Sequence, residues 1–261
     1  MRLPALFLAH AAPTFAVETN ATTAFWEELP AMTGKPPKAL LCISAHWETA
    51  QPRLSSCTSI QHDFYGFSDA LYRLDWPLQE DREVTAWLHE RMQQLDIEVA
   101  LQNDRALDHG VWVPLMRAWP EPPFPVFQLS LSPGKGCSWH CELGQKLLAL
   151  RDEGVLVVSS GGICHNLKRL DWHADDNIPS AWAATFMQEV DEAIRNRDFK
   201  KLYDPWQMSH GRDCVPTIEH YLPLLVMLGM AGKDKLALLH QGWQFGSLSL
   251  HCYGLGVEAR T

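Results

Sequence analysis

The sequence predicts an α/β fold in which helices cover both faces of a mostly parallel or mixed central sheet. Short apolar runs alternate with amphipathic helical patterns along the chain, which is typical of strands joined by crossover helices. The 261 residues are 46% hydrophobic and 20% charged, so the chain can bury one large core. The proline-rich stretches at 35–37 and 119–125 are too short to be linkers, and a single domain over residues 1–261 is expected.

Seven short apolar runs are predicted to be strands. They are almost continuously hydrophobic, as strands buried on both faces of a parallel sheet are. The last run alternates small polar and apolar residues, which predicts an edge or antiparallel strand. The seven runs cover residues 6–9, 40–44, 97–101, 126–131, 155–159, 236–239 and 247–253.

Helices are predicted where apolar residues recur on one face of the chain, over 81–94, 138–152 and 180–196. A further helix over 220–230 is apolar nearly all round and is therefore expected to be buried. The segment 11–38 between the first two strands is long enough for a crossover with a helix around 22–29.

Charge and composition exclude several classes of partner. A formal net charge of −9 disfavours nucleic acid. No apolar run approaches the ~20 residues of a membrane helix, so no membrane partner is expected. Residues 1–10 resemble a signal peptide only superficially, because Pro4 and His10 interrupt the apolar stretch, and they are predicted to be the first buried strand.

The seven cysteines are predicted to be reduced and mostly buried, which is typical of a cytoplasmic protein with a large core. Cys137 and Cys141 form the only close pair, with His140 between them. A zinc knuckle at this place is disfavoured because no second pair of ligands lies nearby.

Four histidines stand where strands end or a helix begins. His10 and His46 each follow an alanine at the end of an apolar run, and His165 follows a run that ends in a glycine pair. His220 is predicted to open the buried helix, with Thr217 as its N-cap. Strand ends in open α/β sheets point into the ligand crevice, and neutral imidazole is the commonest protein metal ligand. The pattern therefore predicts a mononuclear metal site, with structural capping as the alternative for each histidine.

The roles of some of these residues stay open on residue patterns alone. Glu219 is a rival ligand to His220, because adjacent helical residues point in different directions and only one of them is expected to face the metal. His165 is either a fourth ligand or a general acid/base, and His109, which follows Asp108, either contacts substrate or is structural.

The motifs around these histidines resemble the class III extradiol ring-cleaving dioxygenases, in particular the DOPA-dioxygenase type. The resemblance extends from Phe7 to Gly254, with the motifs in family order. Ala11 stands where the family commonly has glycine, and Ala9 where it commonly has serine or glycine. The motifs are LAHAAP (8–13), SAHWE (44–48), LDHGVW (107–112), SGGICHNL (160–167) and PTIEHYLPLL (216–225), with weaker matches in HDFYGF (62–67) and GSLS (246–249).

The resemblance implies one divalent metal ion per chain, held by His10, His46 and His220. It implies that His165 is the acid/base residue and that His109 contacts the substrate. The ion is expected to be Fe(II) for catalysis, Zn(II) as found in purified protein, or both, since imidazole sites bind Zn(II) more tightly. The implied reaction is extradiol cleavage of a catechol by O2. The whole chain is expected to be a single catalytic domain for this reaction.

Two other functions are compatible with the same residues. A three-imidazole site also suits a zinc hydrolase, in which metal-bound water is the nucleophile. A non-enzymatic binding protein on the same scaffold is the other alternative, because a fold does not by itself determine function. The aromatic residues Tyr65, Phe67, Trp112, Trp243 and Phe245 are candidates for a substrate pocket or for the core, and the sequence does not predict an oligomeric state.

Overall fold

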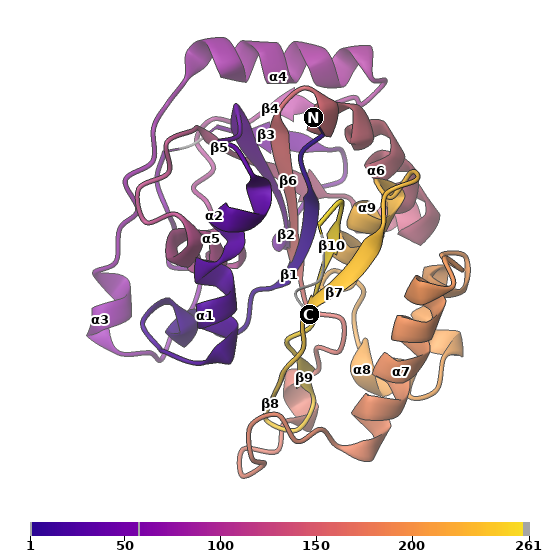
Figure 1. The fold of residues 1–261 in the computed structure, drawn as a ribbon. Coiled ribbons are helices and arrows are strands. Elements are labelled where there is room, and N and C mark those ends of the chain that lie inside the picture. The colour runs from indigo at the N-terminus through magenta and orange to yellow at the C-terminus, as the bar shows by residue number, and fades with distance from the viewer. Residues whose placement is uncertain (1, 57, 258–261) are drawn as a thin grey trace.

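The fold of the computed structural model, which describes residues 2–56 and 58–257, is built on a mixed eight-stranded sheet (Figure 1). Its strands are β1 (Ala5–Ala9), β2 (Ala39–Glu48), β3 (Arg53–Ser55), β4 (Ala100–Leu101), β5 (Val126–Leu131), β6 (Val155–Gly161), β7 (Leu236–His240) and β10 (Cys252–Leu255). The order across the sheet is β4-β3-β5-β2-β6-β1-β10-β7, and β8 (Trp243–Gln244) and β9 (Leu248–Ser249) form a separate antiparallel ribbon.

Four parallel strands, β5, β2, β6 and β1, form the centre of the sheet. Because they run in one direction, their carboxyl ends meet at one edge, which is where open α/β sheets bind ligands. β10 is antiparallel to both β1 and β7, and β3 is antiparallel to β5. The sheet is thus parallel at its centre and mixed toward its sides, as predicted.

Helices pack on both faces because the central strands are apolar on both (Figure 1). In β1, Phe7 packs in one buried cluster and Leu6 and Leu8 pack in the other, as the alternation of strand side chains requires. The helices are α1 (Ala21–Glu27), α2 (Leu29–Thr33), α3 (Asp69–Tyr72), α4 (Arg82–Gln94), α5 (His109–Ala118), α6 (Gly136–Asp152), α7 (Ala181–Arg195), α8 (Gly211–Cys214) and α9 (Leu222–Gly229). The chain also forms short 3-10 helices at η1 (Pro13–Ala16), η2 (Pro133–Lys135), η3 (Leu167–Arg169), η4 (Lys201–Tyr203) and η5 (Pro205–Gln207).

The last predicted strand and the strand at 97–101 are shorter in the structure than expected. Only Ala100–Leu101 of the latter pairs, because β4 lies at the edge of the sheet and meets only β3. The run 247–253 is split, since Leu248–Ser249 pairs with β8 and only Cys252–Leu255 joins the main sheet. The short strands β3 and β8 were not predicted, because neither carries a long apolar run.

The buried helix begins later than predicted. α9 starts at Leu222 with Pro223 in its first turn, and His220 lies in the turn that precedes it. Thr217 is not the N-cap, because its hydroxyl donates to Glu219 Oε1 at 2.7 Å. The expected burial of this helix is confirmed, since every residue of α9 is buried.

The expectation for the cysteines can be checked at all of them except Cys57, which lies outside the described residues. The six described cysteines have free thiols, and all of these except Cys137 are buried. Among the helices of residues 2–56 and 58–257, none combines the length and the apolar character that crossing a bilayer requires.

α6 and α9 approach each other closely at two glycines. A Cβ atom on Gly229 would lie 2.0 Å from the carbonyl oxygen of Cys141, and one on Gly144 would lie 2.0 Å from that of Val226. Only glycine permits this backbone contact. The contact holds α9, and with it the turn that carries His220, against the sheet.

We expect Gly229→Ala to lower the free energy of unfolding by about 1–3 kcal/mol, because the added methyl group must separate the two helices. Urea denaturation followed by circular dichroism measures this change. Gly134→Ala is the matched control, since a Cβ there meets no atom within 4 Å, and it should change stability by less than about 0.5 kcal/mol. Equal stability of the two variants would contradict the close packing.

Candidate metal and active site

Three histidine side chains converge at the carboxyl edge of the parallel strands. His10 follows β1, His46 lies in the last part of β2, and His220 precedes α9. One nitrogen atom of each ring lies within 4.8 Å of one nitrogen of the other two. β1 and β2 are not direct neighbours, because β6 lies between them, and the end of β6 supplies contacts to the cluster.

His10 is held by a hydrogen-bond chain that determines its tautomer. The ring is buried, and its Nδ1 lies 3.0 Å from Ser160 Oγ. The Ser160 hydroxyl donates its single proton to the carbonyl oxygen of Gly110. It must therefore accept from His10 Nδ1–H, which leaves Nε2 of His10 unprotonated and able to bind a metal ion.

His220 is oriented in the same way by a carboxylate. Its Nδ1 lies 3.0 Å from Glu219 Oε1, which also accepts from Thr217. Burial raises the pKa of Glu219, but the hydrogen bonds from His220 and Thr217 outweigh it and lower the pKa to about 2. Glu219 is thus an ionised partner of the His220 ring. Glu219 lies against Nδ1, the ring nitrogen opposite Nε2, so its position favours an orienting role over that of a rival ligand.

His46 faces two carboxylates with its Nδ1 atom. Asp108 Oδ1 lies 3.6 Å away and Asp63 Oδ2 lies 3.9 Å away. Asp108 is fully buried, and it accepts hydrogen bonds from Ser44 and Gln128. Burial raises the pKa of Asp108, but His46 and these two hydrogen bonds lower it overall to about 2. A negative charge beside Nδ1 favours the Nδ1–H tautomer of His46, which again leaves Nε2 free.

The arrangement of these Nε2 atoms fits a metal ion. His46 Nε2 and His220 Nε2 lie only 3.0 Å apart. The Nδ1–H of His220 donates to Glu219, and the charge of Asp108 favours the same tautomer in His46. With both rings in this tautomer, the two lone pairs repel each other at this distance unless a cation lies between them. Burial, followed by the charges of the neighbouring imidazoles, lowers the pKa of His10. A neutral ring is the form that binds a metal.

His165 and His220 stack face to face. Their ring centroids are 3.7 Å apart with an interplanar angle of 6°, and the backbone N–H of His165 donates to the carbonyl oxygen of Cys214. Burial lowers the pKa of His165, and the neighbouring His220 and His46 lower it further. His165 is not part of the cluster of three possible ligands, so its position favours the acid/base alternative.

The glycine pair Gly161–Gly162 before His165 makes a close backbone contact. Without a Cβ atom, a glycine lets another group approach the backbone closely. Although both line the cavity described below, a Cβ on Gly161 would lie 2.3 Å from the carbonyl oxygen of His220. That carbonyl accepts from the N–H of Gly162 at 2.9 Å. The pair therefore lets the His220 turn dock on the end of β6.

His109 lies at the first position of α5, next to the metal-ligand candidates. Its ring centroid is 4.1 Å from that of His46, and its Nδ1 lies 3.0 Å from Asp63 Oδ1. Burial raises the pKa of Asp63, but the hydrogen bonds and charge of His109 lower it overall. Asp108, which adjoins His109 in the chain, lies beside His46 instead.

The histidines open into one cavity of about 610 Å³. His10, His46, His109, His165 and His220 all line it. Its remaining walls are mainly apolar and come from the segment after β1, from the loop before α3, from η3 and the residues that follow it, and from the β8–β9 ribbon and the residues next to it. Those wall residues include Ala12, Pro13, Phe67, Leu167, Leu170, Trp172, Phe245, Leu248 and Leu250. A mainly apolar cavity with a few convergent polar groups is typical of a small-molecule site.

Comparison with known proteins agrees with this geometry. A family model described as the catalytic LigB subunit of aromatic ring-opening dioxygenase matches residues 4–256. The chain belongs to this family. It is 36% identical over 265 residues to the 4,5-DOPA dioxygenase extradiol of Escherichia coli K12, covering 98% of this chain and 95% of that protein. It is therefore an extradiol aromatic ring-opening dioxygenase.

Other relatives of this LigB-family chain support the assignment. The 4,5-DOPA dioxygenase extradiol of Beta vulgaris is 33% identical over 261 residues, which cover 95% of this chain and 94% of that protein. The crystal structure of an uncharacterized protein from Escherichia coli K12 has a TM-score of 0.83 at 32% identity, and the match covers 98% of this chain and 100% of that chain. The predicted α/β fold and family resemblance are confirmed.

The structure explains one departure of this LigB-family chain from its family's pattern. Ala11, directly after His10, has a φ of +55°, a left-handed conformation that favours glycine. The family's usual glycine suits this conformation without strain, whereas alanine adopts it at a cost of about 1 kcal/mol. The turn after the first histidine therefore keeps its shape here.

Several other histidines and aromatic residues lie outside the site. His240 hydrogen-bonds Thr22 Oγ1 at 2.9 Å. His140 uses both ring nitrogens locally, with Gly136 O and with the N–H of Ser132, so it is not part of a zinc knuckle. Of the five aromatic candidates, only Phe67 and Phe245 line the cavity, whereas Trp112 and Trp243 are buried in the core and Tyr65 is 92% exposed.

The sequence did not indicate which side chains hydrogen-bond or face the histidine rings of this LigB-family site. Ser160, Asp63 and Asp108 lie in motifs that carried the family resemblance, and Glu219 was read as a rival ligand. Their roles depend on which ring each one meets in space. Asp63 lies 46 residues before its partner His109, so spacing along the chain does not indicate the pair.

We expect Asp108→Asn to weaken metal binding by about 10–100-fold, because the variant removes the negative charge beside His46 Nδ1. Competition titration with a chelator measures the affinity. Asp191→Asn is the control, since Asp191 of α7 accepts from the hydroxyl of Tyr253 in β10 and is not among the described residues that line the cavity. Unchanged affinity in Asp108→Asn would show that this carboxylate does not orient His46.

Proposed function

We propose that residues 1–261 form a single catalytic domain that uses one divalent metal ion to open a catechol-type ring with O2. The observation that supports this most directly is the convergence of the Nε2 atoms of His10, His46 and His220, each with its Nδ1 directed at a hydrogen-bonding or anionic partner. These three side chains would hold the ion, Fe(II) for catalysis or Zn(II) as purified. A bound ion supplies a Lewis acid with open positions for an anionic catechol and for O2.

The reaction inserts both oxygen atoms of O2 into the substrate. The bond between one hydroxyl-bearing carbon and the adjacent carbon outside the diol breaks, and its ends become a carboxylic acid and an aldehyde. The catechol supplies the electrons that reduce O2, so no external reductant is needed.

The histidines that do not hold the metal would handle protons and substrate. His165 is neutral at rest and lines the cavity beside His220, so it can accept a catechol proton and return it to an oxygen atom during ring opening. His109 is held by Asp63, and its ring lies beside that of His46 at the cavity wall, where it can hydrogen-bond a substrate hydroxyl. Phe67 can contact the aromatic ring.

The proposed location and partners of the enzyme are inferred from its free thiols, its cavity and its net charge. The free thiols of the described cysteines suit the cytoplasm, where glutathione keeps thiols reduced. The substrates would be a small catechol and O2. The net charge of −9 argues against nucleic acid as a partner.

Family membership favours the dioxygenase over the two alternatives considered from the sequence. A zinc hydrolase would use the same three imidazoles, but it would consume no O2. A binding protein would need no acid/base residue beside the ligands, whereas His165 stacks on His220 at 3.7 Å.

We expect His10→Ala, His46→Ala and His220→Ala each to lose most of the bound metal, because a single ion needs all three ligands. Elemental analysis after reconstitution with Fe(II) under anaerobic conditions measures the content. His140→Gln is the matched control and should keep about one equivalent, since His140 lies on α6 away from the cavity. Full metal content in any of the three alanine variants would remove that histidine from the ligand set.

We expect His165→Ala to keep its Fe(II) while kcat for O2 uptake with catechols falls by about 10²–10⁴-fold, the usual contribution of a positioned acid/base. An oxygen electrode and the appearance of a yellow ring-opened product report turnover. Loss of metal together with activity would instead make His165 a fourth ligand. Turnover of esters or amides by only the Zn(II) form, without O2 uptake, would contradict the dioxygenase.

A further inference from the structure

The substrate cavity has an uneven distribution of charge away from the histidines. Glu18 is the only carboxylate among the described residues that line it, and none of those residues is a lysine or arginine. Glu18 is half-buried, and within the described chain its carboxylate has no hydrogen bond or ion pair. A partly desolvated carboxylate without a partner favours a cation in the cavity.

Gln244 provides a second unpaired acceptor close to Glu18. Its Oε1 atom is buried and has no hydrogen-bond partner among residues 2–56 and 58–257. Glu18, Gln244 and Leu250 together line both the main cavity and a small hollow that adjoins it, which places the two polar side chains on one wall. A buried acceptor without a donor is rare and costs free energy unless a ligand satisfies it.

Aromatic side chains extend this wall. Phe245 follows Gln244 directly, and its ring centroid lies 4.6 Å from that of Trp172. Trp172 lines the cavity although 68% of its surface is exposed, so its ring stands at the mouth. Aromatic faces attract ammonium groups, and a carboxylate beside them strengthens this preference.

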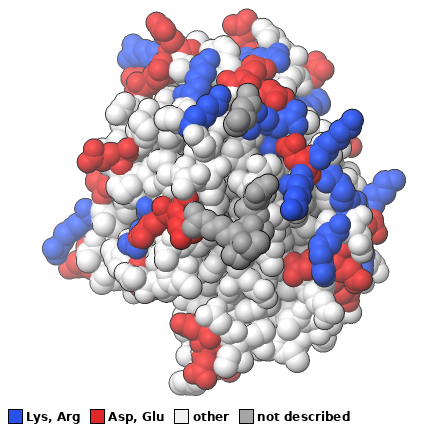
Figure 2. All heavy atoms as spheres, viewed as in Figure 1, with Lys and Arg blue, Asp and Glu red and all other residues white. Residues whose placement is uncertain are grey.

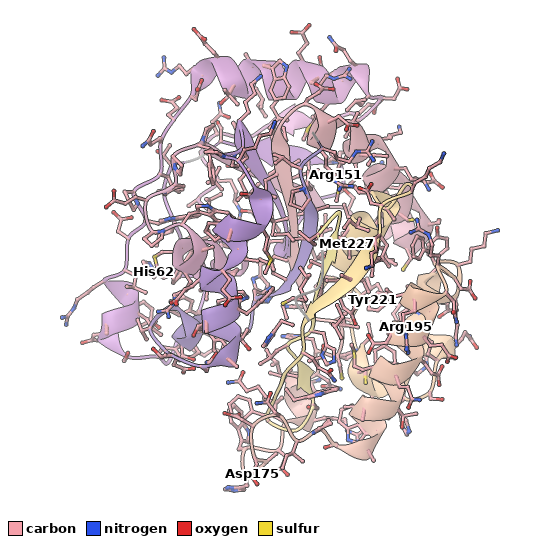
Figure 3. The ribbon with its side chains drawn as sticks, in the orientation of Figure 1. His62, Arg151, Asp175, Arg195, Tyr221 and Met227 are labelled. Carbon is pink, nitrogen blue, oxygen red and sulfur yellow. The ribbon has the colours of Figure 1, made fainter. Side chains whose placement is uncertain are left out.

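The surface around the mouth has the same sign of charge. Asp171, Asp175 and Asp176 are exposed on the loop that carries Trp172. Figure 3 shows Asp175 at the tip of this loop, below β8 and β9, and Figure 2 shows a cluster of acidic side chains at that place. A carboxylate-rich mouth raises the local concentration of cationic substrates.

The basic side chains nearest to this wall in the chain, Lys168 and Arg169, do not line the cavity. Arg169 pairs with Asp213 and lies over the ring of Trp182. Lys168 is exposed in η3, and it is not among the described residues that line the cavity, whereas Leu167 and Leu170 are.

We propose that Glu18, Gln244 and the Trp172–Phe245 pair form a subsite for an ammonium group on the substrate side chain. The preferred substrates are then catechols with a cationic amine substituent and no carboxylate. An ammonium group has three donors for the two acceptors and a charge for the aromatic faces. A carboxylate on the substrate would lie beside the negative charge of Glu18, and no lysine or arginine among the described cavity residues could pair with it. This inference rests on the proposed catechol site.

The test uses three catechols of nearly equal size that differ in charge. They carry a two-carbon chain at ring position 4 that ends in an ammonium, a methyl or a carboxylate group, and a fourth compound, DOPA, carries both charges. Anaerobic titration of the Fe(II) protein gives Kd, and O2 uptake is measured separately. We expect the amine to bind about tenfold or more tightly than the methyl compound, with the carboxylate weakest and DOPA weaker than the amine.

Glu18→Gln should reduce the preference for the amine over the methyl compound to near unity. Trp172→Leu should reduce it in part, by loss of the cation–π contact. Glu83→Gln is the matched control, because it removes the same charge from the exposed side of α4 at the far end of the molecule (Figure 1), and it should keep the wild-type ratio.

Two results would overturn the subsite. One is equal Kd for the amine and the carboxylate compound in the wild type, and the other is an unchanged ratio in Glu18→Gln. Absence of O2 uptake with all four catechols would refute the proposed reaction and leave the order of Kd values as the measure of the subsite.

Discussion

The structure of the site depends on three imidazoles whose Nδ1 atoms are each directed at an acceptor. His10 donates to Ser160, His220 to Glu219, and His46 faces Asp108. Each of these contacts favours the tautomer with the proton on Nδ1, so that the lone pair of Nε2 faces the centre of the cluster. The rings then form a neutral, converging donor set at a place where burial disfavours protonation of His10 and His220. Without these partners the tautomers of the rings would not be set, and the lone pairs would not be directed toward one point.

The sheet and one helix pair bring these residues together. β6 lies between β1 and β2, so the two strand-end histidines reach the cluster from either side of it. The glycines at the end of β6 and at the α6–α9 contact let the turn with His220 approach within van der Waals distance. The ammonium subsite lies elsewhere on the cavity wall, on the segment that follows β1, the loop after η3 and the β8–β9 ribbon. The ligand cluster and the side-chain recognition proposed here can therefore vary independently.

Much of the site was predictable because its chemistry lies in local patterns. An apolar strand followed by alanine and histidine occurs twice, and the glycine pair marks the third strand end. The partners were harder to predict, because a carboxylate shows no preference in sequence for the ring that it will meet. Asp108 adjoins His109 in the chain but lies beside His46, and Asp63 reaches His109 across a long loop.

The sequence by itself determined the α/β class, the buried strands and the histidines that meet at one edge, because hydrophobic periodicity and strand-end positions are local properties. Tertiary structure alone decided the insertion of β6 between β1 and β2, the split of the last strand, and the later start of α9. It also decided the tautomers and the unpaired acceptors of the cavity wall. These depend on contacts between segments far apart in the chain, which no local pattern encodes.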